Sequence, residues 1–185
     1  MPKKVFCVFA FSAILLSLPA NAQKRRFGEL PPPPIPTACG AMQAKFEVRP
    51  SKNLQLPAPE AGKALVYFLE EDTNTQFITH TSRIAVDGKW MGATYGSSYF
   101  SFKVDPGVHH LCATTQTGIA TGDVLTALAH FTAEAGGVYY FDVKNISLRV
   151  SSIIYSNDAT LIPVDTDQGK YLTSWFKLVE SRQKK

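Results

Sequence analysis

The chain has 185 residues, of which 45% are hydrophobic, and it carries a formal net charge of +4. This charge is small and scattered, so it does not predict nucleic-acid binding, which needs a clustered basic face. The two short basic clusters, Lys24–Arg26 and Arg182–Lys185, are expected to be solvated ends of the folded part.

The first 22 residues have the pattern of a cleavable signal peptide. Two lysines precede an uncharged run from Val5 to Leu18, which is shorter than the roughly 20 residues that a membrane-spanning helix needs. Small residues at Ala20–Ala22 favour cleavage before Gln23, which would lower the net charge to +2. A buried N-terminal helix is the alternative. We therefore expect a periplasmic or extracellular protein with no transmembrane segment in the mature chain.

Cleavage leaves two cysteines, Cys39 and Cys112, in an oxidising compartment, where a disulfide between them is expected. The bridge would close a loop of roughly 70 residues. Zinc binding is a rival use, but the chain lacks the C-x-x-C spacing typical of zinc sites. Lipid attachment at Cys39 is not favoured, because a proline-rich segment separates this cysteine from the apolar run.

Residues 23–62 are predicted to form a proline-rich linker that precedes a domain of residues 63–185. The run Pro31–Pro36 can neither pair in a sheet nor continue a helix, and it favours an extended spacer. A second break follows at Leu56–Gly62. Between these breaks, residues 45–49 would form an extra strand if Phe46 and Val48 were buried.

The domain is predicted to be mainly β, with an antiparallel sandwich architecture, because short apolar runs alternate with turn residues. The run Ala64–Leu69 is expected to be a strand buried on both faces. Asp87-Gly88 favours a tight hairpin turn, and Glu134–Gly137 favours another. Further strands are expected at residues 83–86, 89–92, 99–104, 108–113, 127–133 and 138–143.

The C-terminal region departs from the strand pattern. After Asp165, apolar residues recur at helical spacing, at Tyr171, Leu172, Trp175, Phe176 and Val179. We expect an amphipathic helix packed on the sandwich, with Asp165 as its cap. A strand through Tyr171–Leu178 is the alternative, because Gly169 weakens the first helical turn.

Several spaced motifs resemble a family of bacterial exported domains known only as a domain of unknown function. They are Lys63–Phe68, Val86–Gly92, Ser98–Phe100, Pro106–Leu111, Ala133–Gly136 and Tyr139–Phe141. The pieces around Asp87 and Pro106 are also similar to small sandwich repeats of the transthyretin-like group. The resemblance covers residues 63–185 and implies a transthyretin/immunoglobulin-like sandwich. It implies no activity, because the family has none assigned and a fold does not define a function.

Few residues could carry catalysis. His109 and His110 are neighbours in a predicted strand, so their side chains should point to opposite faces and cannot share a metal ion. His110 and His130 could meet across a sheet, although a structural role is the simpler interpretation. Cys112 beside His110 could be a nucleophile, but a disulfide explains this cysteine better. The chain has no Gly-x-Ser-x-Gly, His-Glu-x-x-His or phosphate-loop motif.

Two polar segments are predicted to be solvated turns or loops. Glu70–Asp72 could ligate calcium, but it lacks the spacing of calcium loops. Thr117–Asp123 contains glycines but no lysine for a phosphate.

Trp90, Tyr95 and Tyr99 are the candidate binding surface. They lie around a hairpin and its following loop, where aromatic rings beside small polar residues suit recognition of sugars, peptides or a partner protein. For Trp90, core packing is the favoured interpretation, whereas Tyr95 is expected to be exposed.

These observations predict an exported, non-enzymatic binding or interaction module of the cell envelope, without a cofactor or a metal. Its partner would be an unknown envelope protein or a glycan. The alternative is a secreted hydrolase or a metal-dependent enzyme that uses His110, His130 and Cys112.

Overall fold

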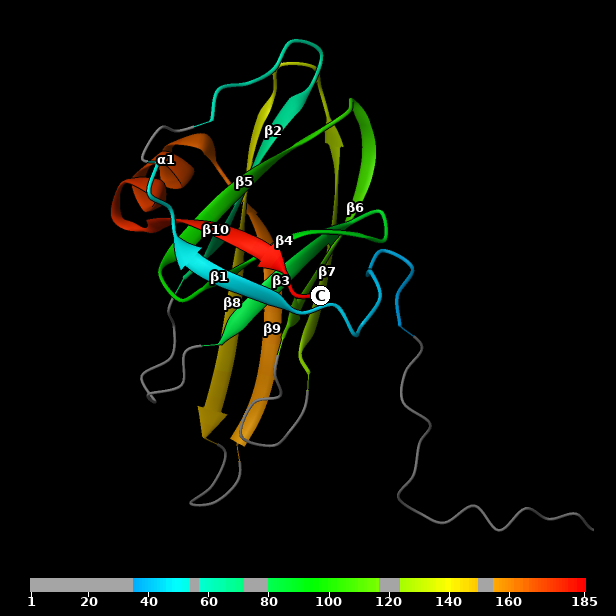
Figure 1. The fold of residues 1–185 in the computed structure, drawn as a ribbon, viewed down its shortest axis with the longest axis vertical. Coiled ribbons are helices and arrows are strands. Elements are labelled where there is room, and N and C mark those ends of the chain that lie inside the picture. The colour runs from blue at the N-terminus through cyan, green and yellow to red at the C-terminus, as the bar shows by residue number, and fades with distance from the viewer. Residues whose placement is uncertain (1–34, 54–56, 72–79, 117–123, 150–154) are drawn as a thin grey trace, which may run out of the picture. The chain divides into compact units, whose positions relative to one another are not determined.

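The computed structural model describes residues 35–53, 57–71, 80–116, 124–149 and 155–185. The predicted signal peptide, Pro31–Pro34 and Thr117–Asp123 lie outside these residues. The described part contains ten strands and one helix (Figure 1). In chain order they are β1 Phe46–Pro50, β2 Ala64–Glu70, β3 Thr81–Val86, β4 Lys89–Tyr95, β5 Ser98–Val104, β6 Gly107–Thr115, β7 Thr126–Ala133, β8 Val138–Arg149, β9 Tyr155–Val164, α1 Thr166–Trp175 and β10 Lys177–Gln183.

The strands form two sheets that pack as a sandwich. One sheet has the order β1-β10-β5-β2-β8-β9, and the other has the order β4-β3-β6-β7. The predicted fold class, a mainly β sandwich with a C-terminal helix, is confirmed. Two pairings are parallel, however: β2 pairs with β8 over Leu65–Glu70, and β10 pairs with β5 at only two positions. Between β2 and β8 the chain crosses to the other sheet and back twice, first through β3 and β4 and then through β6 and β7, so β2 and β8 need not be antiparallel.

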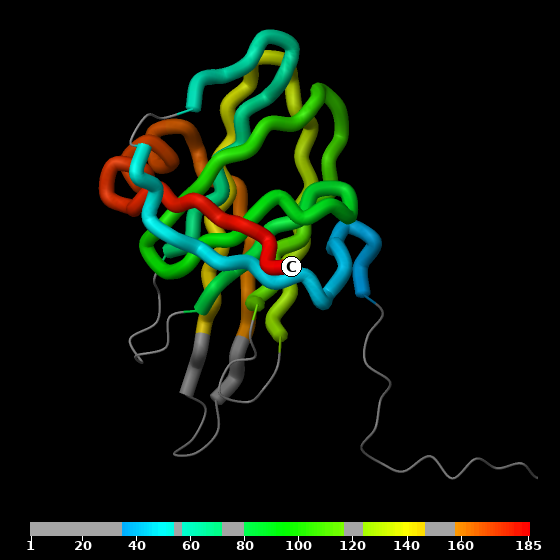
Figure 2. Tube along the Cα trace, viewed as in Figure 1, coloured from blue at the N-terminus to red at the C-terminus, as the bar shows by residue number. Residues whose placement is uncertain are grey.

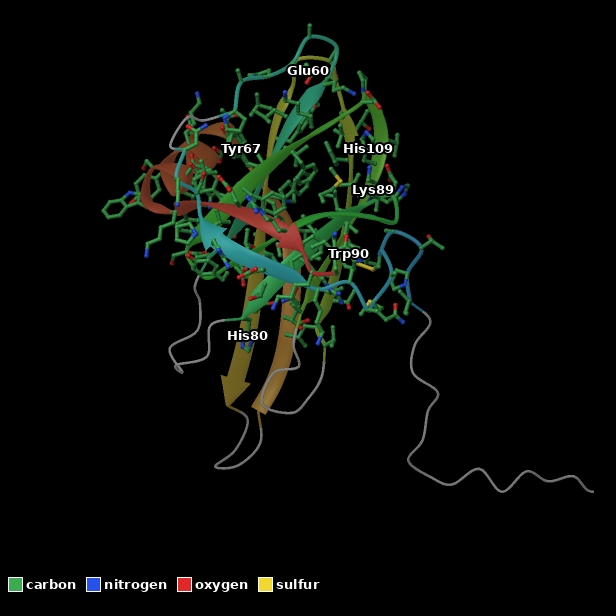
Figure 3. The ribbon with its side chains drawn as sticks, in the orientation of Figure 1. Glu60, Tyr67, His80, Lys89, Trp90 and His109 are labelled. Atoms are coloured by element: carbon green, nitrogen blue, oxygen red, sulfur yellow. A yellow bond between two sulfur atoms is a disulfide. The ribbon has the colours of Figure 1, made fainter. Side chains whose placement is uncertain are left out.

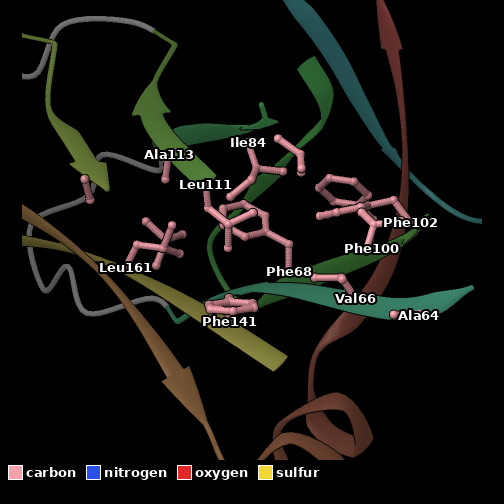
Figure 4. Close-up of a cluster of buried hydrophobic side chains, with 14 of the residues drawn as sticks. Ala64, Val66, Phe68, Ile84, Phe100, Phe102, Leu111, Ala113, Phe141 and Leu161 are labelled. Atoms are coloured by element: carbon pink, nitrogen blue, oxygen red, sulfur yellow. The ribbon is translucent and has the colours of Figure 1, made fainter. Parts of the chain in front are cut away.

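Strand β2 is covered on both of its faces. Its inner side chains point into the core between the sheets (Figure 4) and are Ala64, Val66 and Phe68. Its outer side chains form a second cluster with residues of α1 and are Leu65, Tyr67 and Leu69. Every residue of the strand is buried, so the prediction of a strand covered on both faces is confirmed.

Tight turns connect β3 to β4 and β4 to β5. Asp87 and Gly88 have positive φ angles of 49° and 81°, as the Asp-Gly pair predicts. The strand predicted at residues 89–92 is longer, because β4 continues to Tyr95, so the loop expected directly after residue 92 is wrong. Small residues allow other elements to approach this part of β4 closely. A Cβ atom at Gly92 would lie 2.5 Å from the Ser181 hydroxyl and 2.7 Å from the Phe100 ring.

The C-terminal residues form a helix and then a strand. Asp165 caps α1 by accepting hydrogen bonds from the backbone N–H groups of Asp167 and Gln168, each at 2.9 Å, so the predicted helix and its cap are confirmed. The chain then enters β10, which the sequence did not predict as a separate element. β10 pairs antiparallel with β1 from Phe46 to Pro50, and Figure 2 shows these two segments side by side.

Strand β1 lies at the edge of the six-stranded sheet, within the region predicted to be a linker. Phe46 is buried and Val48 is half-buried against the core. Among the described residues, the compact unit extends from Ile35 to Lys185.

Candidate functional site

Residues 35–45, here called the strap, lie against the outer face of the four-stranded sheet. The predicted disulfide joins Cys39 of the strap to Cys112 of β6. The Gly88 N–H donates to the Ala38 carbonyl at 3.0 Å, which ties the strap to the β3–β4 turn. Covalent and hydrogen bonds therefore fix the strap at several points on the sheet.

Trp90 packs against this strap. Its indole N–H donates to the Ala41 carbonyl at 2.8 Å. The strap approaches the ring so closely that a Cβ atom at Gly40 would lie 2.4 Å from the indole nitrogen. Figure 3 shows Trp90 on the side of the sandwich where the strap runs. Trp90 is half-buried and packs against the strap, which agrees with the packing role favoured for it and not with a place on the candidate binding surface.

Arg83 on β3 lies between the sheet and the strap and donates hydrogen bonds to the strap. Its side chain is fully buried, donates to the Thr114 hydroxyl at 2.8 Å and to the Met42 carbonyl at 2.9 Å, and also donates to the Ala44 carbonyl. The guanidinium lies 4.5 Å from the centre of the Trp90 ring. Carbonyl oxygens and an aromatic face therefore compensate the buried charge.

Tyr95 and Tyr99 do not form an open surface. Tyr95 is half-buried and packs against the main core, because β4 is a regular strand at this position. Tyr99 is buried in the cluster beneath α1, with its ring centre 6.1 Å from that of Tyr67. The expected exposure of Tyr95 and the surface role of Tyr99 are therefore wrong.

The most exposed aromatic side chains among the described residues are Tyr171 and Trp175, on the outward side of α1. Their ring centres are 6.1 Å apart. The helical spacing predicts α1, but it does not separate these two residues from Leu172 and Phe176, which pack onto the sheet.

A hollow of about 260 Å³ lies between the strap and strands β6 and β7. We call it the histidine hollow. It is lined by Pro36, Thr37, Ala38, His110, Leu111, Leu128, Ala129 and His130. Most of its wall is apolar, so the two imidazoles are its main polar groups.

His110 and His130 face each other directly across the antiparallel pair of β6 and β7. Their ring centres are 6.3 Å apart, and both side chains are exposed. The possibility that these histidines meet across a sheet is thus confirmed. Because they are exposed on the outer face, they are not buried structural histidines.

The neighbouring His109 points the other way, toward Phe131, as strand alternation predicts. Its Nδ1 lies 2.7 Å from an Asp87 carboxylate oxygen, and its Nε2 lies 2.7 Å from the Asp105 carbonyl. Burial lowers the pKa of His109, but these two oxygens outweigh that effect and raise the pKa above its usual value. His109 is therefore a structural histidine.

Glu70 is buried between the sheets and is not part of a solvated turn, which corrects the prediction for this residue. Its carboxylate accepts hydrogen bonds from the Ser82 hydroxyl at 2.9 Å, the Thr94 hydroxyl at 2.7 Å and the Asn145 amide at 3.2 Å. Burial raises the pKa of Glu70 to about 7, despite these donors. The strand pattern of β2 already places residue 70 on the inner face, which is the signal that could have identified it.

Asp142, on the outer face beside β2, is a second buried carboxylate. It accepts a hydrogen bond from the Glu71 N–H at 3.3 Å and lies 3.6 Å from the Lys144 ammonium. Burial raises its pKa to about 6, although Lys144 opposes the shift. Glu71 itself pairs with Lys144 at 2.6 Å, and Asp72 lies outside the described residues.

Within the described ranges, no group of three or more His, Cys, Asp or Glu side chains is arranged to hold a metal ion. No helix in this part of the chain is long and apolar enough to span a membrane. Cys112 is in the disulfide and does not present a free thiol.

The chain matches no protein-family model, no curated protein and no solved structure. The resemblance to exported domains of unknown function therefore stays a prediction from the sequence motifs.

Proposed function

We propose that this protein is an exported, non-enzymatic binding module of the cell envelope, and that its ligand occupies the histidine hollow. The observation that carries the proposal is the construction of the hollow. One wall is the strap, which Cys39–Cys112 fastens to the sheet, and the opposite wall presents two exposed imidazoles.

The disulfide that fastens the strap is consistent with export, because disulfides persist in oxidising compartments and not in the cytosol. The signal peptide predicted for residues 1–22 would direct the chain to such a compartment. In the oxidised protein, the bridge keeps Pro36–Ala38 beside β6, so the hollow depends on the compartment that export provides.

Binding is favoured over catalysis by the state of Cys112. The enzyme alternative uses this residue as the nucleophile, and a bridged cysteine cannot act as one. His110 and His130 then remain as hydrogen-bonding groups at the edge of an apolar wall.

The size of the hollow favours a small group. Pockets for drug-sized ligands usually measure about 300–1,000 Å³, so a hollow of about 260 Å³ suits one sugar ring or one side chain of a larger envelope partner. The apolar wall would contact the flat face of such a group, and the imidazoles would hydrogen-bond to its edge.

Amide chemical-shift mapping of the oxidised protein tests this proposal. The probes are a peptidoglycan disaccharide-peptide, an N-acetylglucosamine oligomer and a set of tripeptides. We expect at least one probe to shift the amides of Ala38, His110 and Ala129, and Leu128→Arg to abolish the shifts by filling the hollow. Leu128 is 53% exposed, so this variant should fold.

Tyr171→Arg is the matched control, because Tyr171 is a similarly exposed apolar residue on α1. It should leave binding unchanged. Loss of binding in Tyr171→Arg with retention in Leu128→Arg would transfer the site to the Tyr171–Trp175 pair. Absence of shifts in the hollow with every probe would contradict the proposal.

A further inference from the structure

We propose that His110 and His130 chelate a divalent transition-metal ion at the open side of the histidine hollow, and that they bind Cu²⁺ most tightly. This inference rests on the proposed function, because the ion would occupy the same hollow and form part of its binding surface. It assigns a ligand class to two side chains that the fold does not otherwise use.

The register of β6 and β7 is the first argument. Residues directly opposite each other in an antiparallel pair have Cα atoms about 4.5–5.5 Å apart, which allows two imidazoles to reach one ion. The His110 and His130 ring centres are 6.3 Å apart. A metal–nitrogen distance of about 2.0–2.1 Å requires the rings to turn slightly toward each other. Both side chains are exposed, which leaves them room to rotate.

Asp87 provides the second argument. One of its carboxylate oxygens accepts a hydrogen bond from the backbone N–H of His110 at 2.9 Å and lies 3.9 Å from the ring nitrogen Nδ1 of His110. A carboxylate on this side favours the tautomer with its proton on Nδ1, and the lone pair of Nε2 is then free for the ion. Metal-binding histidines commonly have such a carboxylate or carbonyl near the other ring nitrogen.

The neighbouring histidine is excluded as a ligand by its contacts. Both ring nitrogens of His109 are engaged, one by Asp87 and the other by the Asp105 carbonyl, each at 2.7 Å. It also faces Phe131 and not the hollow. The ligand pair is therefore His110 and His130.

Two imidazoles favour a particular group of ions. Imidazole suits Zn²⁺, Ni²⁺ and Cu²⁺, and for a given set of ligands Cu²⁺ binds most tightly. The described residues add no third clustered ligand, so water would fill the remaining positions. We therefore expect an exchangeable ion with open coordination positions, to which a ligand in the hollow could bind directly.

Copper titration of the tag-free, oxidised protein tests the inference. Copper sulfate is added, and binding is followed by calorimetry and by electron paramagnetic resonance. We expect one bound Cu²⁺ with hyperfine splitting from two imidazole nitrogens. His110→Gln and His130→Gln should each weaken binding at least about tenfold and reduce the splitting to one nitrogen. Both positions are exposed, so the variants should fold.

His109→Gln is the control, and it should keep the affinity and the two-nitrogen spectrum. Loss of binding in this variant would assign the ion to His109 and Asp87 and overturn the inference. Unchanged binding in His110→Gln and His130→Gln would also overturn it. If copper fails to bind but the organic probes still shift the amides of the hollow, only this inference fails and the proposed function stands.

Discussion

Two adjacent residues of β3, Ser82 and Arg83, take part in hydrogen bonds of buried charged groups on the two faces of the strand. Ser82 donates to the Glu70 carboxylate between the sheets, and Arg83 lies on the opposite face, beneath the strap. A buried charge is costly unless hydrogen bonds compensate it. The Glu70 carboxylate and the Arg83 guanidinium each have several hydrogen-bond partners. Polar contacts on each face of β3 therefore hold this strand in one register.

Replacing Arg83 tests its role under the strap. Arg83→Lys keeps the charge but loses the planar fork that reaches Thr114 and the two strap carbonyls. We expect a loss of about 2–4 kcal/mol in the free energy of unfolding, measured by urea denaturation. Arg49→Lys, at an exposed site on β1, should leave the midpoint unchanged. Equal midpoints for Arg83→Lys and the wild type would contradict this role.

The buried Glu70 predicts a pH dependence of stability. Its pKa is about 7 in the folded protein against 4.5 in the unfolded chain, so folding takes up a proton between these pH values. The contribution of Glu70 to stability is therefore fully present below pH 4.5 and is lost as the pH rises through about 7. The raised pKa of Asp142, about 6, acts in the same direction.

Glu70→Gln removes the contribution of Glu70 to this dependence. An amide can keep the contacts with Ser82 and Thr94, because the Thr94 hydroxyl can accept a hydrogen bond as well as donate one. The variant should match the wild type near pH 4.5 and exceed its unfolding free energy by on the order of 2–3 kcal/mol at about pH 8. A difference that does not vary with pH in denaturation experiments would disprove this account of Glu70.

Only some of the candidate site residues could be predicted from the sequence, and the reasons differ from residue to residue. Cys39 and Cys112 could be paired because only two cysteines follow the predicted cleavage point. Packing could be favoured for Trp90, but its partner could not be predicted, because its contacts come from the strap, about fifty positions earlier in the chain. Strand alternation separated His109 from His110, but only the register of β6 and β7 shows that His110 meets His130.

At the scale of elements, α1 packs closely against the sheet at Gly169. A Cβ atom at Gly169 would lie 2.3 Å from the Tyr140 ring. Leu172 and Phe176 pack around the same cluster. The close approach explains a glycine inside a helix, where it normally costs about 1 kcal/mol relative to alanine.

Gly169→Ala should therefore destabilise the protein, contrary to helix propensity. We expect a loss of about 1–3 kcal/mol from the overlap with Tyr140, measured by thermal or urea unfolding. Ser174→Ala, at an exposed position of the same helix, should be neutral or slightly stabilising. A gain in stability for Gly169→Ala would show that the helix can move away from Tyr140 at little cost.

Some elements were predictable from local pattern and others were not. β2, the Asp-Gly hairpin and the capped helix each have a local signal, and all three are present. β9 was not predicted, because it contains Asn157, Asp158 and Pro163, which are unfavourable in strands. These residues are tolerated here because β9 lies at the edge of its sheet. β10 follows α1 directly and is defined by pairing with β1 and β5, which are distant in sequence.

At the scale of the whole molecule, the first and last described segments of the chain lie side by side in the fold. β1 and β10 pair at one side of the sandwich, and the strap that precedes β1 covers part of the outer face of the other sheet. The histidine hollow lies where this strap meets β6 and β7. The proposed binding site therefore depends on the disulfide, and through it on export.

Intact mass measurement of the protein purified from the cell envelope, alkylated with and without prior reduction, tests this dependence most directly. Our account predicts a chain that begins at Gln23, is not alkylated as isolated and gains two alkyl groups, at Cys39 and Cys112, after reduction. A chain that retains residues 1–22, or that is alkylated without reduction, would contradict export or the bridge, and with it the proposed site.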